Sequence, residues 1–164
     1  MDSGAIPAPI CQVRWPSDAA RDWAIRAIDV LRAESNTLAV VFFGSSVRPV
    51  SSVGDLDLLI VFESHEPELA DVPIDVDVRS YAASMVPELI RKGHDLLGWA
   101  IRYGVVAYER NSYWSHLRRD WMPNLPFPSS AIAEERAERA EGLLRKLQAI
   151  GDDGTQLTLL TGAG

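Results

Sequence analysis

The stretch LAVVFFGSSVRPVSSVGDLDLLIVF, residues 38–62, decides the fold of this chain. An apolar run from Leu38 to Phe43 opens it, and a second apolar run from Leu58 to Phe62 closes it. A Gly-Ser-Ser turn and a polar connection lie between the two runs. Short continuous apolar runs bounded by turn residues are typical of buried strands. We therefore predict two buried strands here, the second beginning near Asp55.

Two carboxylates stand at the start of the second strand. Asp55 and Asp57 are two residues apart, so their side chains share one face of the strand, with Cα atoms roughly 6.5 to 7 Å apart. Such a pair is costly in a partly buried place unless a positive group lies between the two carboxylates. A magnesium ion is the simplest candidate, because it binds a few carboxylates together with substrate phosphates.

The turn before these acids has the features that phosphate groups need. Gly44, Ser45 and Ser46 are small, and they offer free backbone N–H groups and two hydroxyls. Arg48 follows closely and could contact a triphosphate, although a solvent-exposed loop arginine is an equally good interpretation. The sequence thus places a candidate phosphate site next to a candidate metal site.

The sequence contains Gly44-Ser45, then nine further residues, then Asp55-Leu56-Asp57-Leu58. This order and spacing resemble the signature of the DNA polymerase β-like nucleotidyltransferase superfamily. The similarity is greatest to its small, minimal nucleotidyltransferase members, and it covers roughly residues 38–80. The family pattern continues with a third carboxylate between apolar residues on a later strand, which residues 73–78 (PIDVDV) can supply. The resemblance implies an α/β fold in which helices flank a small mixed β-sheet, with further helices at the C-terminus.

The resemblance also implies an activity, namely the transfer of a nucleoside monophosphate from an NTP to an acceptor with release of pyrophosphate. Asp55, Asp57 and the third carboxylate would hold two Mg²⁺ ions, or Mn²⁺ in their place. Gly44 and Ser45 would seat the phosphates, assisted by Ser46 and Arg48. The sequence does not define the acceptor, which could be a protein, an RNA or a small molecule.

Asp75 and Asp77 both fit the third position. They share one face of a strand, because Ile74, Val76 and Val78 alternate with them. Pro73 lacks an N–H group and favours a strand start, which leaves Asp75 close to the strand entry and Asp77 further inside. We therefore predict that Asp77 is the third metal ligand, and that Asp75 is a supporting or solvated acid.

The rest of the chain is predicted to be mainly helical. Ser17 is a plausible N-cap for a helix over 18–33, in which Trp23 lies on the apolar face. Further elements are expected as a helix over 85–103, a short strand over 105–108, a helix over 111–122 and a charged helix over 130–150. The predicted domain plan is an N-terminal arm (1–16), a nucleotidyltransferase core (17–110), a C-terminal helical extension (111–150) and a flexible tail (151–164).

Composition limits the function further. The chain has 164 residues, of which 47% are hydrophobic, as expected for one globular domain. A net charge of −7 argues against a broad nucleic-acid-binding surface. Cys11 is the single cysteine, so no internal disulfide can form. No stretch has the apolar length of a membrane span, and no signal peptide is evident, so we expect a cytoplasmic protein without membrane contact.

Two other functions fit the same sequence. The chain could be a regulatory partner of another protein, such as one component of a toxin–antitoxin pair, a role that would suit its charged C-terminal helix. It could also be an antibiotic-modifying nucleotidyltransferase, although residues 105–150 leave little room for an acceptor domain. Three converging carboxylates separate an enzyme from a simple binding protein, because binding alone does not need them.

Overall fold

The structure is a computed structural model that describes residues 10–49 and 52–126, and five isolated helical positions at 134, 138, 141, 142 and 145. The chain divides into two compact units, residues 1–127 and 128–164, and the elements described below all belong to the first. The rest of the helix predicted over 130–150, and the tail 151–164, lie outside the described residues. None of the described helices is both long enough and apolar enough to cross a membrane.

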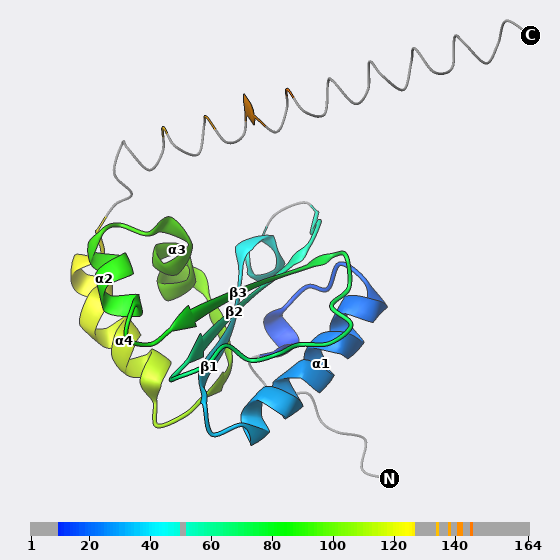
Figure 1. The fold of residues 1–164 in the computed structure, drawn as a ribbon. Helices are drawn as coiled ribbons and strands as arrows, with labels where there is room; N and C mark the ends of the chain where they lie inside the picture. Colours follow the sequence, from blue (N-terminus) through cyan, green and yellow to red (C-terminus); the bar gives the residue numbers. More distant parts are fainter. Residues whose placement is uncertain are drawn as a thin grey trace, which may run out of the picture. The chain divides into compact units, whose positions relative to one another are not determined.

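The first unit contains four strands, four α-helices and three short 3₁₀ helices, labelled η, within the described ranges (Figure 1). In chain order they are η1 (Ile10–Gln12), α1 (Asp18–Ala33), β1 (Thr37–Phe43), η2 (Gly44–Val47), β2 (Leu56–Phe62), β3 (Val76–Ala82), α2 (Val86–Arg91), α3 (Asp95–Tyr103), β4 (Val105–Glu109), α4 (Tyr113–Trp121) and η3 (Met122–Asn124).

The strands form one mixed sheet in the order β3-β2-β1-β4. β1 is antiparallel to both β2 and β4, whereas β2 and β3 are parallel. The end of β1 therefore meets the beginnings of β2 and β3 at one edge of the sheet, which is where the sequence motif lies. The predicted fold class, an α/β domain with a small mixed sheet flanked by helices, is confirmed.

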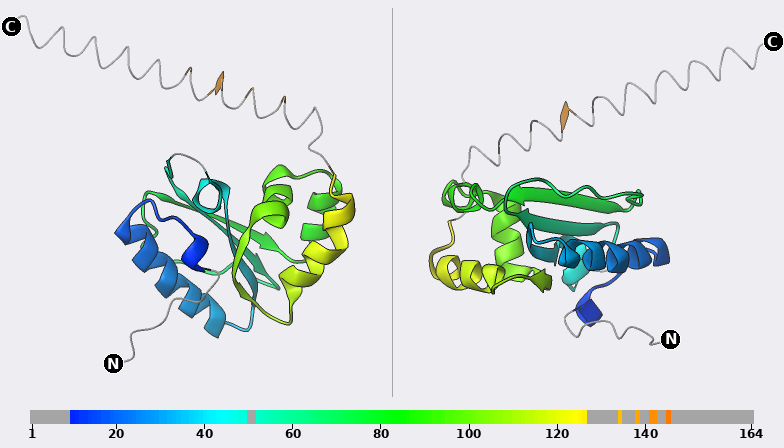
Figure 2. Two further views of the ribbon diagram at one scale, coloured as in Figure 1. Left: turned by 180° about the vertical axis from the view of Figure 1, so that it is seen from behind. Right: turned by 60° about the horizontal axis from the view of Figure 1, so that its bottom comes forward.

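Helices cover both faces of the sheet. α1 lies on one side of the strands, and α2, α3 and α4 group together on the other, as the front view and the reverse view agree (Figures 1 and 2). Alternation along β1 and β2 explains this division, because side chains two apart share a face. The α1 face is filled from the two strands by Val40, Phe42, Leu56, Leu58 and Ile60, and the opposite face by Ala39, Val41, Phe43, Leu59 and Val61.

α1 has the bounds that the sequence predicts. The hydroxyl of Ser17 accepts a hydrogen bond from the Ala20 N–H at 3.0 Å, which satisfies one of the free amides in the first turn. Trp23 is buried in the core, as expected from its place on the apolar face. The strands at 37–43, 56–62 and 105–109 also agree with prediction to within a residue, since each is a compact apolar segment.

The helix predicted over 85–103 is instead two helices, α2 and α3. Gly93 has φ of +76°, a left-handed conformation that ends α2 and that side-chain-bearing residues rarely adopt. The side chain of His94 then caps α3 by accepting from the Leu97 N–H at 3.5 Å. The break turns α3 so that Leu97, Ala100 and Ile101 are buried against the sheet.

Two segments that flank the predicted core, one before residue 17 and one after residue 110, contribute buried side chains to the packing. In the segment predicted to be an extended arm, Ile10 and Val13 are buried, and Trp15 meets Phe42 edge-on with ring centroids 5.6 Å apart. Trp114 in α4 is fully buried in the same cluster as α2 and α3. The sequence pattern did not predict the burial of Ile10 and Val13, because the burial of such a short segment depends on distant residues rather than on its own periodicity.

Candidate functional site

Three carboxylates come together at the end of the sheet where β1 stops. Asp57 in β2 lies opposite Phe43 of β1 on one side and opposite Asp77 of β3 on the other. Asp55 immediately precedes β2. Alternation from the buried Leu59 places these acids on the sheet face that α2, α3 and α4 cover. The sheet thus brings together all three of the carboxylates predicted to bind metal.

The surroundings of Asp57 disfavour the charged form of its carboxyl group. Burial raises the pKa of its carboxyl from 3.8 to about 6, and repulsion from Asp55 and Asp77 adds to the shift. Arg79 and Arg48 act in the opposite direction, without cancelling it. A raised carboxyl pKa means that a proton, or another cation, is favoured at this position.

Gly44 brings the backbone of the turn up to Asp57. Its φ is +71°, in the left-handed region, and a Cβ built on it would lie 1.9 Å from Oδ2 of Asp57. Any side chain here would therefore overlap the carboxylate. Glycine is required at this position so that the turn and the acid can be in contact.

The two serines of the turn have different surroundings. The Ser45 hydroxyl is buried and has no hydrogen-bond partner among the described residues. Buried polar atoms are usually paired, so an unpaired hydroxyl in this turn is an exception that needs an explanation. Ser46 is fully buried, and its hydroxyl donates to the Phe43 carbonyl at 3.0 Å. The Ser46 side chain thus contributes to the shape of the turn.

Arg48 lies against the turn. Its Nε donates to the Gly44 carbonyl at 3.2 Å, and its guanidinium carbon is 4.8 Å from the centre of the Trp99 ring. These contacts place Arg48 beside the turn, and its contact with a triphosphate stays a prediction. A guanidinium in this position can neutralise a bound anion.

Asp77 and Asp75 differ in their partners. Asp77 accepts hydrogen bonds through Oδ2 from Nη2 of Arg79 at 2.7 Å and from its Nε at 3.1 Å, and both side chains are about half exposed. Asp75 lies just before β3 and accepts from the Ser17 hydroxyl at 2.6 Å. Asp75 therefore links the sheet to the start of α1, whereas Asp77 faces Asp57.

The donor chemistry of the carboxylates suits a hard divalent cation such as Mg²⁺, because their oxygens are anionic and because burial and the neighbouring acids disfavour the charged form of Asp57 in the absence of a cation. As the side chains lie, no three acidic, histidine or cysteine groups within the described ranges are close enough together to hold a metal ion. The Asp77 carboxylate would have to turn from Arg79, a movement that its exposure permits. The type of donor atom therefore suits Mg²⁺, and metal binding by Asp55, Asp57 and Asp77 stays a prediction.

Arg14 is a site residue that the sequence pattern did not reveal. Its guanidinium donates to the carbonyls of Ser45, at 3.0 Å, and of Arg48, while its own N–H donates to the Ser46 carbonyl at 2.9 Å. One arginine thus holds three carbonyls of the turn from a segment about thirty residues earlier. The one local signal in the sequence was the pair of apolar residues Ile10 and Val13, three apart, which are both buried in the structure.

Replacing Arg14 with methionine should loosen the turn while leaving the sheet intact. The change keeps the apolar stem but removes donors worth about 0.5–1.5 kcal/mol each, so amide exchange at residues 45–48 should become roughly tenfold faster. Hydrogen-exchange mass spectrometry measures this. Arg21→Met, which removes an exposed arginine from α1, is the control. Equal exchange at 45–48 in wild type and Arg14→Met would contradict the role given to Arg14.

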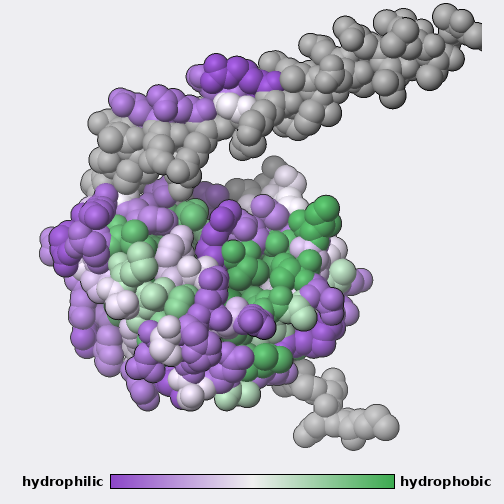
Figure 3. Space-filling model, in the orientation of Figure 1, coloured by the Kyte–Doolittle hydropathy of each residue, from purple (hydrophilic) through white to green (hydrophobic). Residues whose placement is uncertain are grey.

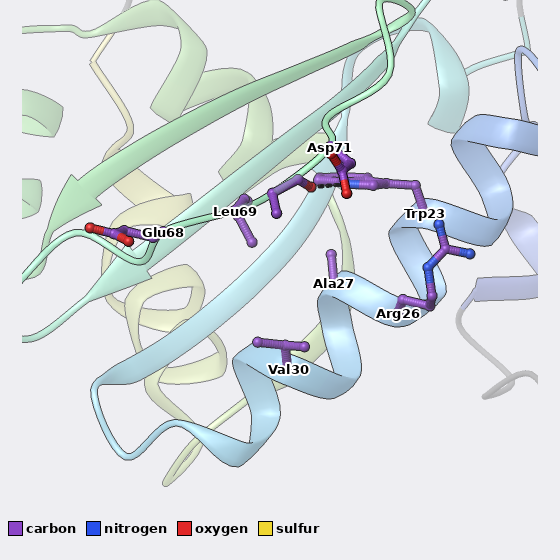
Figure 4. A pocket seen from close by; sticks show the side chains of 8 residues that line it. Trp23, Arg26, Ala27, Val30, Glu68, Leu69 and Asp71 are labelled. Carbon is purple, nitrogen blue, oxygen red and sulfur yellow. Dashed lines mark hydrogen bonds between the residues drawn. The ribbon is translucent and has the colours of Figure 1, made fainter.

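A pocket of about 320 Å³ lies away from these residues. Figure 4 shows Trp23, Ala27 and Val30 of α1 lining it together with Leu69 and other residues of the segment before β3. Figure 3 shows several hydrophobic areas among hydrophilic ones on the face seen in Figure 1. Because α1 covers the sheet face opposite the carboxylates, this pocket is not part of the candidate active site.

Comparisons with known proteins do not identify this chain. No protein-family model and no curated protein matches the chain. One similar solved structure is described as a nucleotidyltransferase-like protein from Exiguobacterium sibiricum 255-15, with 15% sequence identity and a TM-score of 0.46. The similarity covers 64% of this chain but only 39% of that one. A likeness at this level is too weak to assign the chain to a family or to show a shared activity.

Proposed function

We propose that this protein is a magnesium-dependent nucleotidyltransferase that transfers a nucleoside monophosphate from an NTP to an acceptor and releases pyrophosphate. The observation that carries the proposal is the contact between the turn and the acid. Gly44 lies so close to Asp57 that a single added carbon would overlap the carboxylate, and Asp55 and Asp77 flank that carboxylate. A phosphate seated in the turn is therefore next to three acids, which is the arrangement that metal-assisted phosphoryl chemistry needs.

Each residue has a distinct part in this proposal. Asp55, Asp57 and Asp77 would hold two Mg²⁺ ions, which when bound would neutralise phosphate charge and lower the pKa of an attacking hydroxyl. The backbone N–H groups of η2 and the unpaired Ser45 hydroxyl bind phosphate oxygens.

Two arginines support the same proposal. Arg48 supplies positive charge beside the turn. Arg14 keeps the turn in shape through its three carbonyl contacts, so the phosphate site is formed before the nucleotide arrives.

An incorporation assay tests this function. Purified protein is incubated with each NTP labelled at the α-phosphate, with Mg²⁺ and with lysate as the source of acceptor, and both labelled products and released pyrophosphate are measured. The proposal expects label on an acceptor, and pyrophosphate that disappears when EDTA is added. No transfer and no pyrophosphate with any of the four NTPs would contradict it.

The third carboxylate can be identified by comparing two substitutions. Asp77→Asn should lower nucleotidyl transfer about a hundredfold at saturating magnesium, a loss of roughly 2.7 kcal/mol in transition-state stabilisation. Asp75→Asn should leave turnover within about threefold of wild type, because Asp75 bonds to Ser17 rather than facing Asp57. Turnover is measured by pyrophosphate release. An inactive Asp75→Asn beside a fully active Asp77→Asn would reverse the two roles.

A further inference from the structure

α3 exposes two large aromatic side chains that the core does not use. Trp99 is 44% and Tyr103 is 49% exposed, and their ring centroids are 5.0 Å apart with planes tilted by 37°. They lie four residues apart, so they share one face of the helix. The opposite face of α3 is already buried through Leu97, Ala100 and Ile101. Packing of this helix therefore does not explain why two aromatic residues stand on its outer face.

Arg48 connects this aromatic pair to the candidate phosphate site. The guanidinium carbon lies 4.8 Å from the centre of the Trp99 ring, and Nε of the same side chain donates to the Gly44 carbonyl at 3.2 Å. Gly44 in turn contacts Asp57. Arg48 thus contacts both the Trp99 ring and the Gly44 turn, on the sheet face that carries the acids.

We infer that Trp99 and Tyr103 form the stacking surface for the base of the bound nucleotide, with Arg48 between the base and the phosphates. This inference rests on the proposed function. Aromatic side chains bind nucleobases through their π faces, and a neighbouring guanidinium adds a cation–π contact and pairs with phosphate. Because stacking grows with ring area, purine nucleotides should bind more tightly than pyrimidine nucleotides.

Ligands with and without a base provide the test. Calorimetric titrations in magnesium compare ATP with inorganic tripolyphosphate, which has the phosphates alone, on wild type and on Trp99→Ala. We expect Trp99→Ala to weaken ATP binding about tenfold and tripolyphosphate binding much less, because the Gly44 carbonyl still holds Arg48 at the turn. Tyr103→Ala should act in the same direction, and Trp99→Phe should restore most of the ATP affinity. Val30→Ala, which trims an exposed apolar side chain on α1, should change neither affinity.

The outcomes separate this inference from the proposed function. If wild type binds ATP and tripolyphosphate equally well, or if Trp99→Ala keeps its ATP affinity, the base does not stack here and the phosphate site stands. If wild type binds neither ligand, both proposals fail. If ATP affinity is unchanged but wild type self-associates and Trp99→Ala does not, the aromatic pair is a protein-docking surface, which also overturns the inference.

Discussion

Replacing Asp57 with asparagine is expected to lower nucleotidyl transfer at least about a thousandfold, equivalent to roughly 4 kcal/mol of transition-state stabilisation. Asp57 lies between Asp55 and Asp77 and against the Gly44 turn, so it is the one acid that can contact both the metal and the phosphate site. Asparagine has nearly the same shape but lacks the negative charge. Pyrophosphate release at saturating magnesium and NTP measures the effect.

The same substitution should stabilise the protein at neutral pH. The pKa of Asp57 is raised from 3.8 to about 6, so the folded state binds this proton more tightly than the unfolded state does. Its contribution to stability is therefore fully present below about pH 4 and is lost as pH rises through 6. An asparagine side chain does not titrate, so Asp57→Asn should gain stability above pH 6 and gain nothing below pH 4. Because Asp57 is only partly buried, we expect about 1 kcal/mol, or roughly 2–4 °C in Tm.

Melting curves between pH 4 and pH 8, without metal, check this second effect. Asp29→Asn, which changes an exposed acid on α1, is the control and should show no such pH-dependent gain. A large loss of Tm in Asp57→Asn at pH 7.5 would mean that the carboxylate holds the fold together rather than serving a ligand. Activity close to wild type would contradict its catalytic role.

Gly44→Ala is expected to have the largest effect on stability. The left-handed φ of +71° costs alanine about 1–2 kcal/mol, and the new Cβ would lie 1.9 Å from Oδ2 and 3.2 Å from Cβ of Asp57. Rotating the Asp57 side chain would relieve the first contact but would take the carboxylate away from the turn, and the second contact still needs a shift of a few tenths of an ångström. Together these terms predict a loss of about 2–4 kcal/mol, or roughly 5–15 °C in Tm, with loss of nucleotide binding.

Gly54→Ala is the matched control for this prediction. Gly54 belongs to the same connection between β1 and β2, but a Cβ added there meets nothing within 4 Å. It should change the free energy of unfolding by less than about 0.5 kcal/mol. Thermal unfolding and nucleotide titration of the two variants give the comparison. If Gly44→Ala melts and binds like Gly54→Ala, the close contact with Asp57 is not essential.

The strands, α1 and the position of the carboxylates could be predicted because their signals are local. Continuous apolar runs mark β1 and β2, and Ser17 marks the start of α1. Alternation predicted that Asp75 and Asp77 share one face of a strand, but this was wrong for Asp75, because β3 begins at Val76 and Ile74 is fully exposed. In the structure, the register of β3 against β2 sets Asp77 opposite Asp57, whereas Asp75 accepts a hydrogen bond from Ser17, and the choice of Asp77 as metal ligand stays a prediction.

Other parts of the site depend on contacts between distant segments. Arg14 reaches the turn across an interval of 31 to 34 residues, and nothing near it in sequence indicates that its guanidinium serves backbone carbonyls. Trp99 and Tyr103 fall in a segment predicted as one long helix. The break at Gly93 separates α3 from α2, and burial of Leu97, Ala100 and Ile101 leaves these two rings on the outer face.

Magnesium-dependent nucleotide binding tests the central claim most directly. ATP, GTP, CTP and UTP are each titrated calorimetrically into wild type and into Asp57→Asn, with and without magnesium. We predict that wild type binds at least one of the four about tenfold or more tightly with magnesium, and that Asp57→Asn loses this enhancement because one metal ligand is gone. If magnesium strengthens the binding of none of the four nucleotides to wild type, the carboxylates and the Gly44 turn do not form a metal–nucleotide site.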